Sequence, residues 1–128
     1  MTIIAESASR VARSTDPRIN RRIAGRTAER LDAIGYDLDA IHVRLRELDR
    51  EWDIERAIEA NASTLALTGS VLALTVHRRF ALVPAIVSAF LLQHAIQGWC
   101  PPVPMLRRLG FRTNREIENE RLALMKRL

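Results

Sequence analysis

Residues 60–99 read ANASTLALTGSVLALTVHRRFALVPAIVSAFLLQHAIQGW, and this stretch decides the fold class. Between Glu59 and Arg107 the only ionic side chains are those of Arg78 and Arg79, although charged residues make up 27% of the 128-residue chain. Apart from these two arginines, charged residues are therefore absent from one contiguous block. A block of this length with so few charges is typical of segments that lie in a lipid bilayer.

The two arginines divide the block into two apolar runs. Residues 60–76 contain no charge, and in residues 80–106 only His94 titrates near neutral pH. At about 1.5 Å of rise per residue, the shorter run spans about 25 Å, close to the bilayer core of about 30 Å. The connection between the runs is so short that the two helices must be antiparallel neighbours. We therefore predict a two-helix transmembrane hairpin over residues 57–100.

The second run also indicates where its helix begins and ends. Pro84 fits the first turn, because a proline placed deeper would remove a backbone hydrogen bond and kink the helix. Gly98 suits the position just past the last turn, and Trp99 suits the level of the lipid headgroups. The second helix should therefore end near Gly98.

The polar N-terminal segment is expected to begin with a mobile tail over residues 1–14, which show no periodicity. No long apolar stretch follows a basic region there, so we do not expect a cleaved signal peptide. Asp16 is a typical N-cap residue, and Pro17 suits a first helical position. From there we predict one cytoplasmic amphipathic helix over residues 15–56.

A heptad pattern supports that helix. The apolar residues recur at alternating spacings of three and four, at Leu31, Ile34, Leu38, Ile41, Leu45, Leu48 and Trp52. Mixed charges lie between them, as on the solvated face of an amphipathic helix. Two interpretations are open: the stripe packs on the rest of its own chain, or it self-associates as a coiled coil.

Residues 101–128 are predicted to be a cytoplasmic tail with a C-terminal helix. Three prolines at positions 101, 102 and 104 interrupt the chain after the second span. Thr113 and Glu116 form a T-x-x-E capping box that opens a helix over residues 114–127. The expected fold class is an all-α membrane protein, with a two-helix transmembrane hairpin flanked by a long amphipathic N-terminal helix and a short C-terminal helix.

The distribution of arginine predicts the orientation of the hairpin. Eight arginines flank its outer ends, namely Arg44, Arg46, Arg50, Arg56, Arg107, Arg108, Arg112 and Arg115, against two in the loop. The positive-inside rule then places both termini in the cytoplasm, as in a protein of the bacterial inner membrane. The net charge of +5 is concentrated beside the apolar block. We therefore expect contact with the lipid bilayer and not with nucleic acid.

Small side chains in the two runs predict how the helices of the hairpin pack. Where no hydrophobic effect drives membrane helices together, small residues allow close approach of their backbones. The candidate packing residues are Ala62, Ala66, Gly69, Ser70 and Ala73 in the first run, and Ala85 and Ala89 in the second.

Four polar residues near the end of the second run are candidates for function. Gln93, His94 and Gln97 lie within about one turn of an otherwise apolar helix, where polar groups usually face protein or water. Cys100 is the single cysteine, so it is either a small buried hydrophobe or a reactive thiol. On a continuous helix Cys100 would lie about 120° from His94, so the pair predicts no metal site. We expect no catalytic residues and no cofactor.

Three runs carry a resemblance to a known family: WDIERAIEANAS (52–63), FLLQHAIQGWCPPVPMLRRLGFRT (90–113) and REIENERLAL (115–124). Over residues 50–125 the chain resembles the YgaP-like transmembrane-domain family of small bacterial inner-membrane proteins, most specifically at GWCPP. The resemblance implies a two-helix membrane unit that ends near a cysteine and that stands alone or follows a rhodanese sulfurtransferase domain. The residues before Trp52 are too few for that domain, so we do not expect sulfur transfer to carry over.

The expected function is therefore that of a small integral membrane protein. Its role would be structural, anchoring or accessory and non-enzymatic, through self-association as a homo-oligomer or through a membrane protein partner. The alternative is a membrane-associated protein that handles sulfur or redox chemistry with Cys100. A soluble helical bundle with the hairpin as its core is a third possibility, which the long uncharged run over residues 80–106 disfavours.

Overall fold

The protein is helical throughout the part that its structure, a computed structural model, describes, which is residues 9–128. Its elements are α1 (Arg10–Arg13), α2 (Pro17–Ile34), α3 (Leu38–Arg50), α4 (Ile54–Thr75), the 3-10 helix η1 (Arg78–Ala81), α5 (Leu82–Gln97), α6 (Pro102–Arg108) and α7 (Asn114–Met125). Two helical segments, one ending at Thr75 and one over Arg78–Gln97, are long and apolar enough to cross a membrane. The all-helical prediction is therefore confirmed for the described residues.

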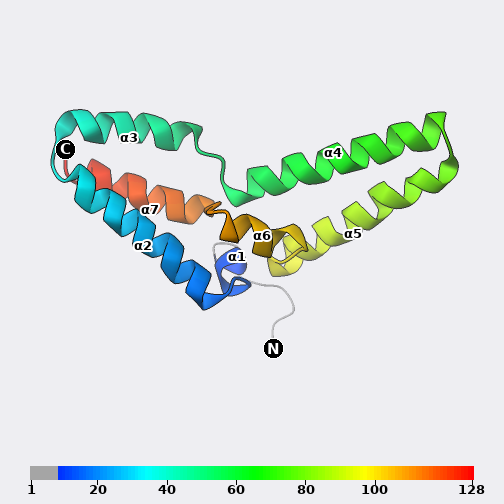
Figure 1. The fold of residues 1–128 in the computed structure, drawn as a ribbon, viewed down its shortest axis with the longest axis horizontal. Helices are drawn as coiled ribbons and strands as arrows, with labels where there is room; N and C mark the ends of the chain where they lie inside the picture. Colours follow the sequence, from blue (N-terminus) through cyan, green and yellow to red (C-terminus); the bar gives the residue numbers. More distant parts are fainter. Residues whose placement is uncertain (1–8) are drawn as a thin grey trace.

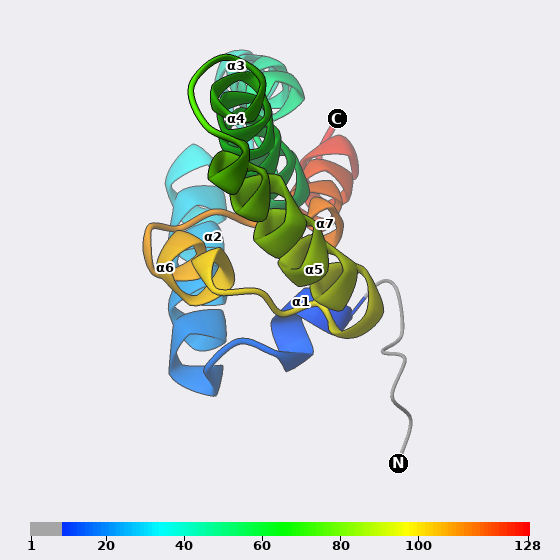
Figure 2. The same ribbon diagram turned by 90° about the vertical axis from the view of Figure 1, so that its right-hand side faces the viewer.

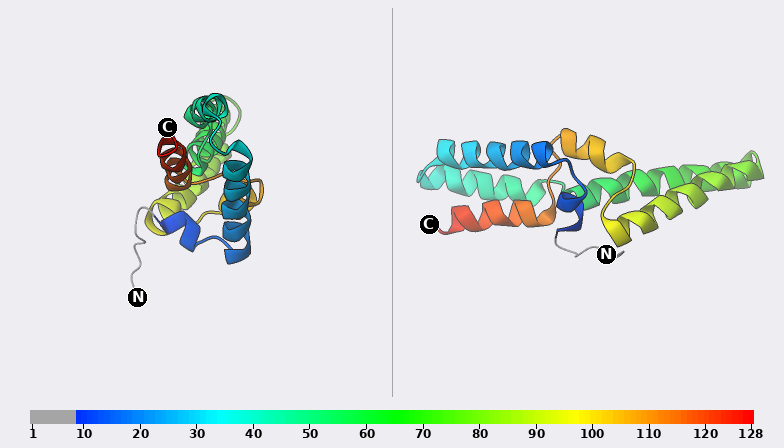
Figure 3. Two further views of the ribbon diagram at one scale, coloured as in Figure 1. Left: turned by 90° about the vertical axis from the view of Figure 1, so that its left-hand side faces the viewer. Right: turned by 90° about the horizontal axis from the view of Figure 1, so that it is seen from below.

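The elements divide into two parts that extend in opposite directions. Helices α2, α3 and α7 lie alongside one another, and α4 and α5 project side by side from the other end (Figure 1). The short helices α1 and α6 lie at the junction, as the views from the side and from below also show (Figures 2 and 3). Only 17% of the apolar window in the first long segment is buried, and only 6% in the second.

The contact between α4 and α5 is centred on Gly69. A β-carbon built on Gly69 would lie 2.7 Å from Cβ of Val83 and 2.8 Å from Cδ of Pro84, so only glycine fits there without a shift of α5. Pro84 lies in the first turn of α5, as predicted. The other predicted small residues of α4 are half-buried, and their spacing places them on the same face of the helix as Gly69: Ala62, Ala66, Ser70 and Ala73.

The predicted packing role of Ala85 and Ala89 is wrong. Both residues are exposed, whereas Val83, Pro84 and Val87 are half-buried. The face of α5 that meets α4 is thus formed by larger side chains, and Ala85 lies on the other side of the helix because each residue advances by about 100°. The small residues of α4 alone provide the close approach.

The predicted single helix over residues 15–56 is also wrong, because the chain breaks and turns back between Ile34 and Leu38. Gly35 has a φ of 58°, and the side chain of Asp37 accepts hydrogen bonds from the backbone N–H groups of Asp39 and Ala40, which caps α3. A strong N-cap after a glycine ends one helix and begins another. The apolar periodicity continued across the break, and this continuity concealed the turn.

The heptad stripe packs within the chain. Ile41 and Leu48 of α3 are buried against Ile117 and Leu124 of α7, and Leu31, Ile34 and Leu45 pack around them. Two members of the stripe are left outside this cluster: Leu38, at the start of α3, is 55% exposed, and Trp52, the last member, is 43% exposed. Most of the stripe therefore forms the core of the α2–α3–α7 bundle.

Two further predictions need correction at the junction. Of the predicted tail over residues 1–14, residues 1–8 lie outside the described part, but Arg10–Arg13 form α1 and Val11 is 3% exposed. The prolines after α5 do not prevent a helix. Pro101 and Pro102 begin α6, because a proline in the first turn loses no hydrogen bond. The capping box of Thr113 and Glu116 at the start of α7 is confirmed.

Buried ion pairs connect the bundle. The guanidinium of Arg107 is fully buried and lies 2.6 Å from Oε1 of Glu116 and 2.9 Å from Oδ1 of Asn20. Glu120, equally buried, accepts from Arg30, Arg44 and Arg112 at 2.7, 2.8 and 3.1 Å. Arg107 and Glu120 are each surrounded by groups of opposite charge or by an amide oxygen. These partners offset the cost of removing the two charges from water. The network fixes α2, α3 and α7 relative to α6.

Candidate functional site

The best-defined polar site of the described chain lies at the junction, where α5 ends beside the first turn of α4. Nε2 of His94 lies 2.8 Å from Oε2 of Glu55, and the His94 side chain is only 4% exposed. His94 and Glu55 are separated by 39 positions in the sequence. They meet because α4 and α5 are antiparallel, so the start of one helix lies beside the end of the other.

Arg10 of α1 completes the pairing. Its guanidinium lies 3.1 Å from Oε1 of Glu55, the carboxylate oxygen that His94 does not use. The hydroxyl of Ser14 donates to the backbone carbonyl of Gln97 at 3.0 Å, which ties the segment after α1 to the end of α5. Glu55 is therefore held from two sides, and its carboxylate has a fixed orientation toward the imidazole.

Cys100 is the second residue that interacts with the imidazole. The thiol is close enough to interact with the His94 ring. The ring nitrogen Nδ1 is buried and makes no hydrogen bond within the part of the chain that is described. Because Nε2 faces a carboxylate, Nε2 carries a proton and Nδ1 is the nitrogen left to exchange a proton with the thiol.

The turn at Gly98 is what brings His94 and Cys100 together. Gly98 ends α5 with a φ of 78°, a conformation that favours glycine, so the chain reverses before Cys100. The 120° separation expected for a continuous helix therefore does not apply. The predicted helix end at Gly98 is confirmed, but the consequence for Cys100 was not foreseen.

The surroundings of the thiol are apolar. Cys100 is 3% exposed and belongs to a cluster with Val11, Ile54, Ile58 and Val103. It also lines a cavity of about 250 Å³ between α4, α5 and the start of α6. The thiol thus lies between a polar pair on one side and an apolar cavity on the other.

The other predicted polar residues lie apart from this pair. Gln97 is exposed and contributes only its backbone carbonyl, while Gln93 is half-buried. The residues that the sequence did not indicate are Glu55 and Arg10. Glu55 looked like one of many charges before the first span, and Arg10 fell in the predicted mobile tail. The apolar Val11 next to Arg10 is a sequence signal that could have pointed to a docked segment, and the structure buries it.

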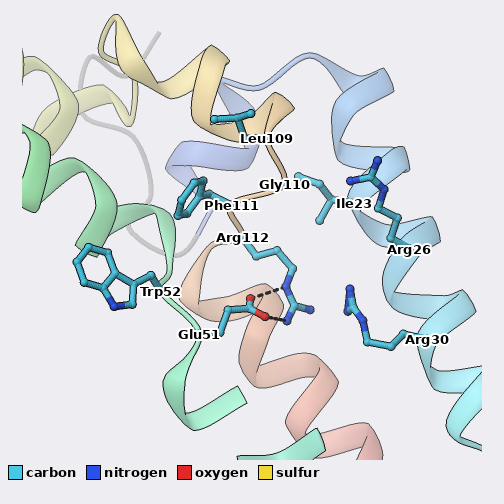
Figure 4. A pocket seen from close by; sticks show the side chains of 9 residues that line it. All are labelled: Ile23, Arg26, Arg30, Glu51, Trp52, Leu109, Gly110, Phe111 and Arg112. Atoms are coloured by element: carbon cyan, nitrogen blue, oxygen red, sulfur yellow. Dashed lines mark hydrogen bonds and ion pairs between the residues drawn. The ribbon is translucent and has the colours of Figure 1, made fainter. Parts of the chain in front are cut away.

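A second cavity of about 300 Å³ lies between α2, the segment after α3 and the loop before α7 (Figure 4). Arg26 and Arg30 of α2 line one side, and Arg112, paired with Glu51 at 2.8 Å, lines the other. Arg30 and Arg112 are also bound to Glu120. Two of the three arginines are thus engaged in the bundle network, so we interpret this cavity as part of the architecture.

The arrangement at the junction is a carboxylate, an imidazole and a thiol in sequence. In enzymes with a nucleophilic cysteine, a base takes the thiol proton and a third group orients the base. Within residues 9–128 no group of three or more His, Cys, Asp and Glu side chains has the geometry to hold a metal ion. The carboxylate, imidazole and thiol at the junction are the residue types that general-base assistance of a thiol requires.

Comparison of the chain with models of protein families, with curated proteins and with solved structures finds no match.

Proposed function

We propose that the protein is an integral membrane protein in which α4 and α5 cross the bilayer as a hairpin and anchor the α2–α3–α7 bundle at the membrane surface. The observation that carries this proposal is the exposure of large apolar side chains on both helices. Leu67, Leu74, Leu82 and Leu92 are 68%, 88%, 65% and 63% exposed. In water such surfaces drive association, whereas lipid tails solvate them without cost.

The charged residues support an orientation with both termini in the cytoplasm of a bacterial cell. Arg78 and Arg79 lie in the turn at the far end of the hairpin. Many more arginines lie at or beyond the junction, and those exposed on α2 and α6 are Arg18, Arg21, Arg22, Arg26 and Arg108. The N-terminal end of α2 and α6 both lie near the base of the hairpin (Figures 1 and 3). Their charges would therefore face the headgroups of anionic lipids.

The role that fits this architecture is structural or accessory. The bundle leaves apolar side chains on its surface, of which Leu38, Leu122 and Met125 are 55%, 54% and 53% exposed. These residues offer contacts for a second copy of the chain or for a membrane protein partner. The resemblance to the YgaP-like transmembrane-domain family agrees with this role.

Topology mapping tests the proposal. Reporters inserted after Arg78 and fused after Leu128 should be active on opposite sides of the bacterial inner membrane, and the protein should resist extraction from membranes with alkaline carbonate. Release by carbonate would show that the chain does not span the bilayer. Cytoplasmic activity of both reporters with retention in the membrane would indicate a re-entrant hairpin, whose turn does not reach the far side of the bilayer.

A second candidate function, sulfur or redox handling by Cys100, is favoured by the contact of its thiol with His94. The first proposal does not depend on this chemistry. If Cys100 has this role, the thiol should react rapidly with alkylating reagents at pH 6, and persulfide or sulfenate should be recoverable from the purified protein. Slow labelling and an unmodified thiol would contradict this second candidate.

A further inference from the structure

We propose that Cys100 is an acyl acceptor: its thiol takes a fatty acyl group from an acyl thioester, and the chain occupies the apolar cavity between α4 and α5. This inference rests on the proposed insertion of α4 and α5 in the bilayer. It goes beyond anchoring because it assigns a chemical modification to one residue and a lipid chain to one cavity.

The groups around the Cys100 thiol support this assignment. Glu55 accepts from Nε2 of His94 at 2.8 Å, and Arg10 holds the opposite carboxylate oxygen at 3.1 Å. The other ring nitrogen, Nδ1, is buried and has no hydrogen-bond partner in the described chain, and the thiol interacts with this ring. A lone cysteine in a core needs no such set of groups. Here an imidazole is present and its orientation is fixed by a carboxylate, which is the set of groups that general-base assistance of a thiol requires.

The cavity that reaches the thiol is lined almost entirely by apolar side chains. Apart from Cys100 and Asn61, its lining is formed by side chains that are apolar. They come from both membrane helices, and Ile58, Leu65, Ile86 and Phe90 are among them. With no charged side chain in this lining, a phosphate or a carboxylate has no partner there, whereas an acyl chain matches the surface. The volume of about 250 Å³ accepts part of a long chain, and the remainder would lie among the lipids.

The position of Cys100 also supports this assignment. Cys100 follows α5 by three residues and precedes α6, so it lies at the base of the hairpin (Figure 1). Cysteines beside membrane segments are the usual sites of S-acylation, because the attached chain enters the bilayer directly. An acyl thioester with a polar leaving group would keep that group on the cytoplasmic side while its chain enters the cavity.

The reaction balances without an oxidant or a reductant. Nδ1 of His94 takes the proton of the Cys100 thiol, and the sulfur attacks the carbonyl carbon of the thioester. A new carbon–sulfur bond forms to Cys100, and the bond between the carbonyl carbon and the leaving sulfur breaks. The leaving thiolate then takes the proton from His94, so the products are S-acyl Cys100 and a free thiol.

The experiment uses the full chain in phosphatidylcholine vesicles and palmitoyl-coenzyme A as the probe. Mass spectrometry should find a palmitoyl adduct on Cys100 that hydroxylamine removes, and Cys100→Ser should abolish it. His94→Gln should slow acylation at pH 7 by about a hundredfold, in the range that a lost general base costs. His42→Gln, which changes an exposed histidine of α3, is the matched control and should leave the rate unchanged.

Two further variants separate a chemical role from a structural one. Glu55→Gln should slow acylation and move its pH profile, because the amide no longer orients and stabilises the imidazolium, while Glu55→Asp should restore part of the rate. Glu59→Gln removes a nearby exposed carboxylate and is the control. Ala62→Leu narrows the cavity, so it should slow palmitoylation more than reaction with acetyl-coenzyme A.

Flotation of the same vesicles distinguishes the possible failures. Protein that does not float with the lipid would contradict the proposed membrane insertion. If the protein floats but forms no hydroxylamine-sensitive adduct, the acylation inference is wrong, and the proposed insertion of α4 and α5 in the membrane is unaffected. Equal acylation rates in the wild type, His94→Gln and Glu55→Gln would also overturn the inference. If either variant loses helicity by circular dichroism, the cavity variant Ala62→Leu decides alone.

Discussion

The main chain of Arg10 lies against Gly98 so closely that a β-carbon at position 98 would overlap the backbone of α1. This contact joins the N-terminal segment to the end of α5. It also places the guanidinium of Arg10 within 3.1 Å of Glu55. The position of α1, and with it the second support of the Glu55 carboxylate, therefore depends on the absence of one side chain.

A substitution at Gly98 should displace α1. We expect Gly98→Ala to lower the melting temperature in detergent, because alanine is strained by about 1 kcal/mol or more at a positive φ and its β-carbon meets Arg10. Gly25→Ala is the control, since a β-carbon there meets nothing within 4 Å and Gly25 lies within α2. That change should stabilise the bundle by up to about 1 kcal/mol. Thermal unfolding followed by circular dichroism measures both, and equal effects would show that α1 does not dock in this way.

The packing of α4 on α5 predicts a contrast between Gly69→Leu and Ala85→Leu. Leucine at position 69 has no room beside Val83 and Pro84, so it should separate the helices. Ala85 is exposed, so leucine there should be tolerated in lipid. Cysteine pairs placed across α4 and α5 would report the separation by their crosslinking yield. Loss of crosslinking in Ala85→Leu and not in Gly69→Leu would reverse the assignment of the α5 face.

Buried and exposed members of the heptad stripe should respond differently to charge. Ile41 is fully buried, so Ile41→Asp places a carboxylate in the core and should destabilise the bundle by about 4 kcal/mol or more. Leu38 is 55% exposed, and Leu38→Asp should leave the bundle folded. Crosslinking in native membranes then tests self-association. Loss of an oligomer in the folded Leu38→Asp variant would assign this exposed position to a contact between copies. An unchanged Ile41→Asp variant would contradict the packing of α3 on α7.

Acid should destabilise the bundle through Glu120 and Glu116. For Glu120, burial acts to raise the pKa, but hydrogen bonds from Arg44 and Arg30 and the nearby charge of Arg112 outweigh it and hold the pKa below its ordinary value. For Glu116, burial likewise acts to raise the pKa, and Arg107 and the backbone of Thr113 lower it overall. A carboxylate whose pKa is lowered in the folded state stabilises the fold above its unfolded pKa of about 4.3. That stabilisation is lost as the pH falls through the folded pKa.

The corresponding measurement is the melting temperature as a function of pH. It should be constant from pH 7 to about 5 and should fall below about pH 4.5. Glu120→Gln should lower it at pH 7, where the unpaired arginines cost about 3 kcal/mol, and should weaken its dependence on acid. Glu47→Gln, which removes an exposed carboxylate of α3, is the control and should preserve the wild-type profile. If both Glu120→Gln and Glu116→Gln keep a steep fall of the melting temperature in acid, groups other than these two carboxylates cause the acid transition.

Local features of the fold followed from the sequence. Asp16 and Pro17, Gly98, and the pair Thr113 and Glu116 each mark a helix boundary, because caps and positive-φ positions depend on a few adjacent residues. The two apolar runs likewise gave two long helices. Errors arose where periodicity continued across a turn, as at Gly35, and where Pro101 and Pro102 served as a helix start and not as a stop.

What the sequence alone determined is where charge is absent and where helices begin, since both depend on neighbours along the chain. Only the tertiary structure decided which side chains meet. It placed Glu55 beside His94 through the antiparallel course of α4 and α5, brought Cys100 back to the same ring through the turn at Gly98, and docked Arg10 from a segment expected to be mobile. Contacts between distant positions depend on how the helices are oriented, and no local pattern of residues records that orientation.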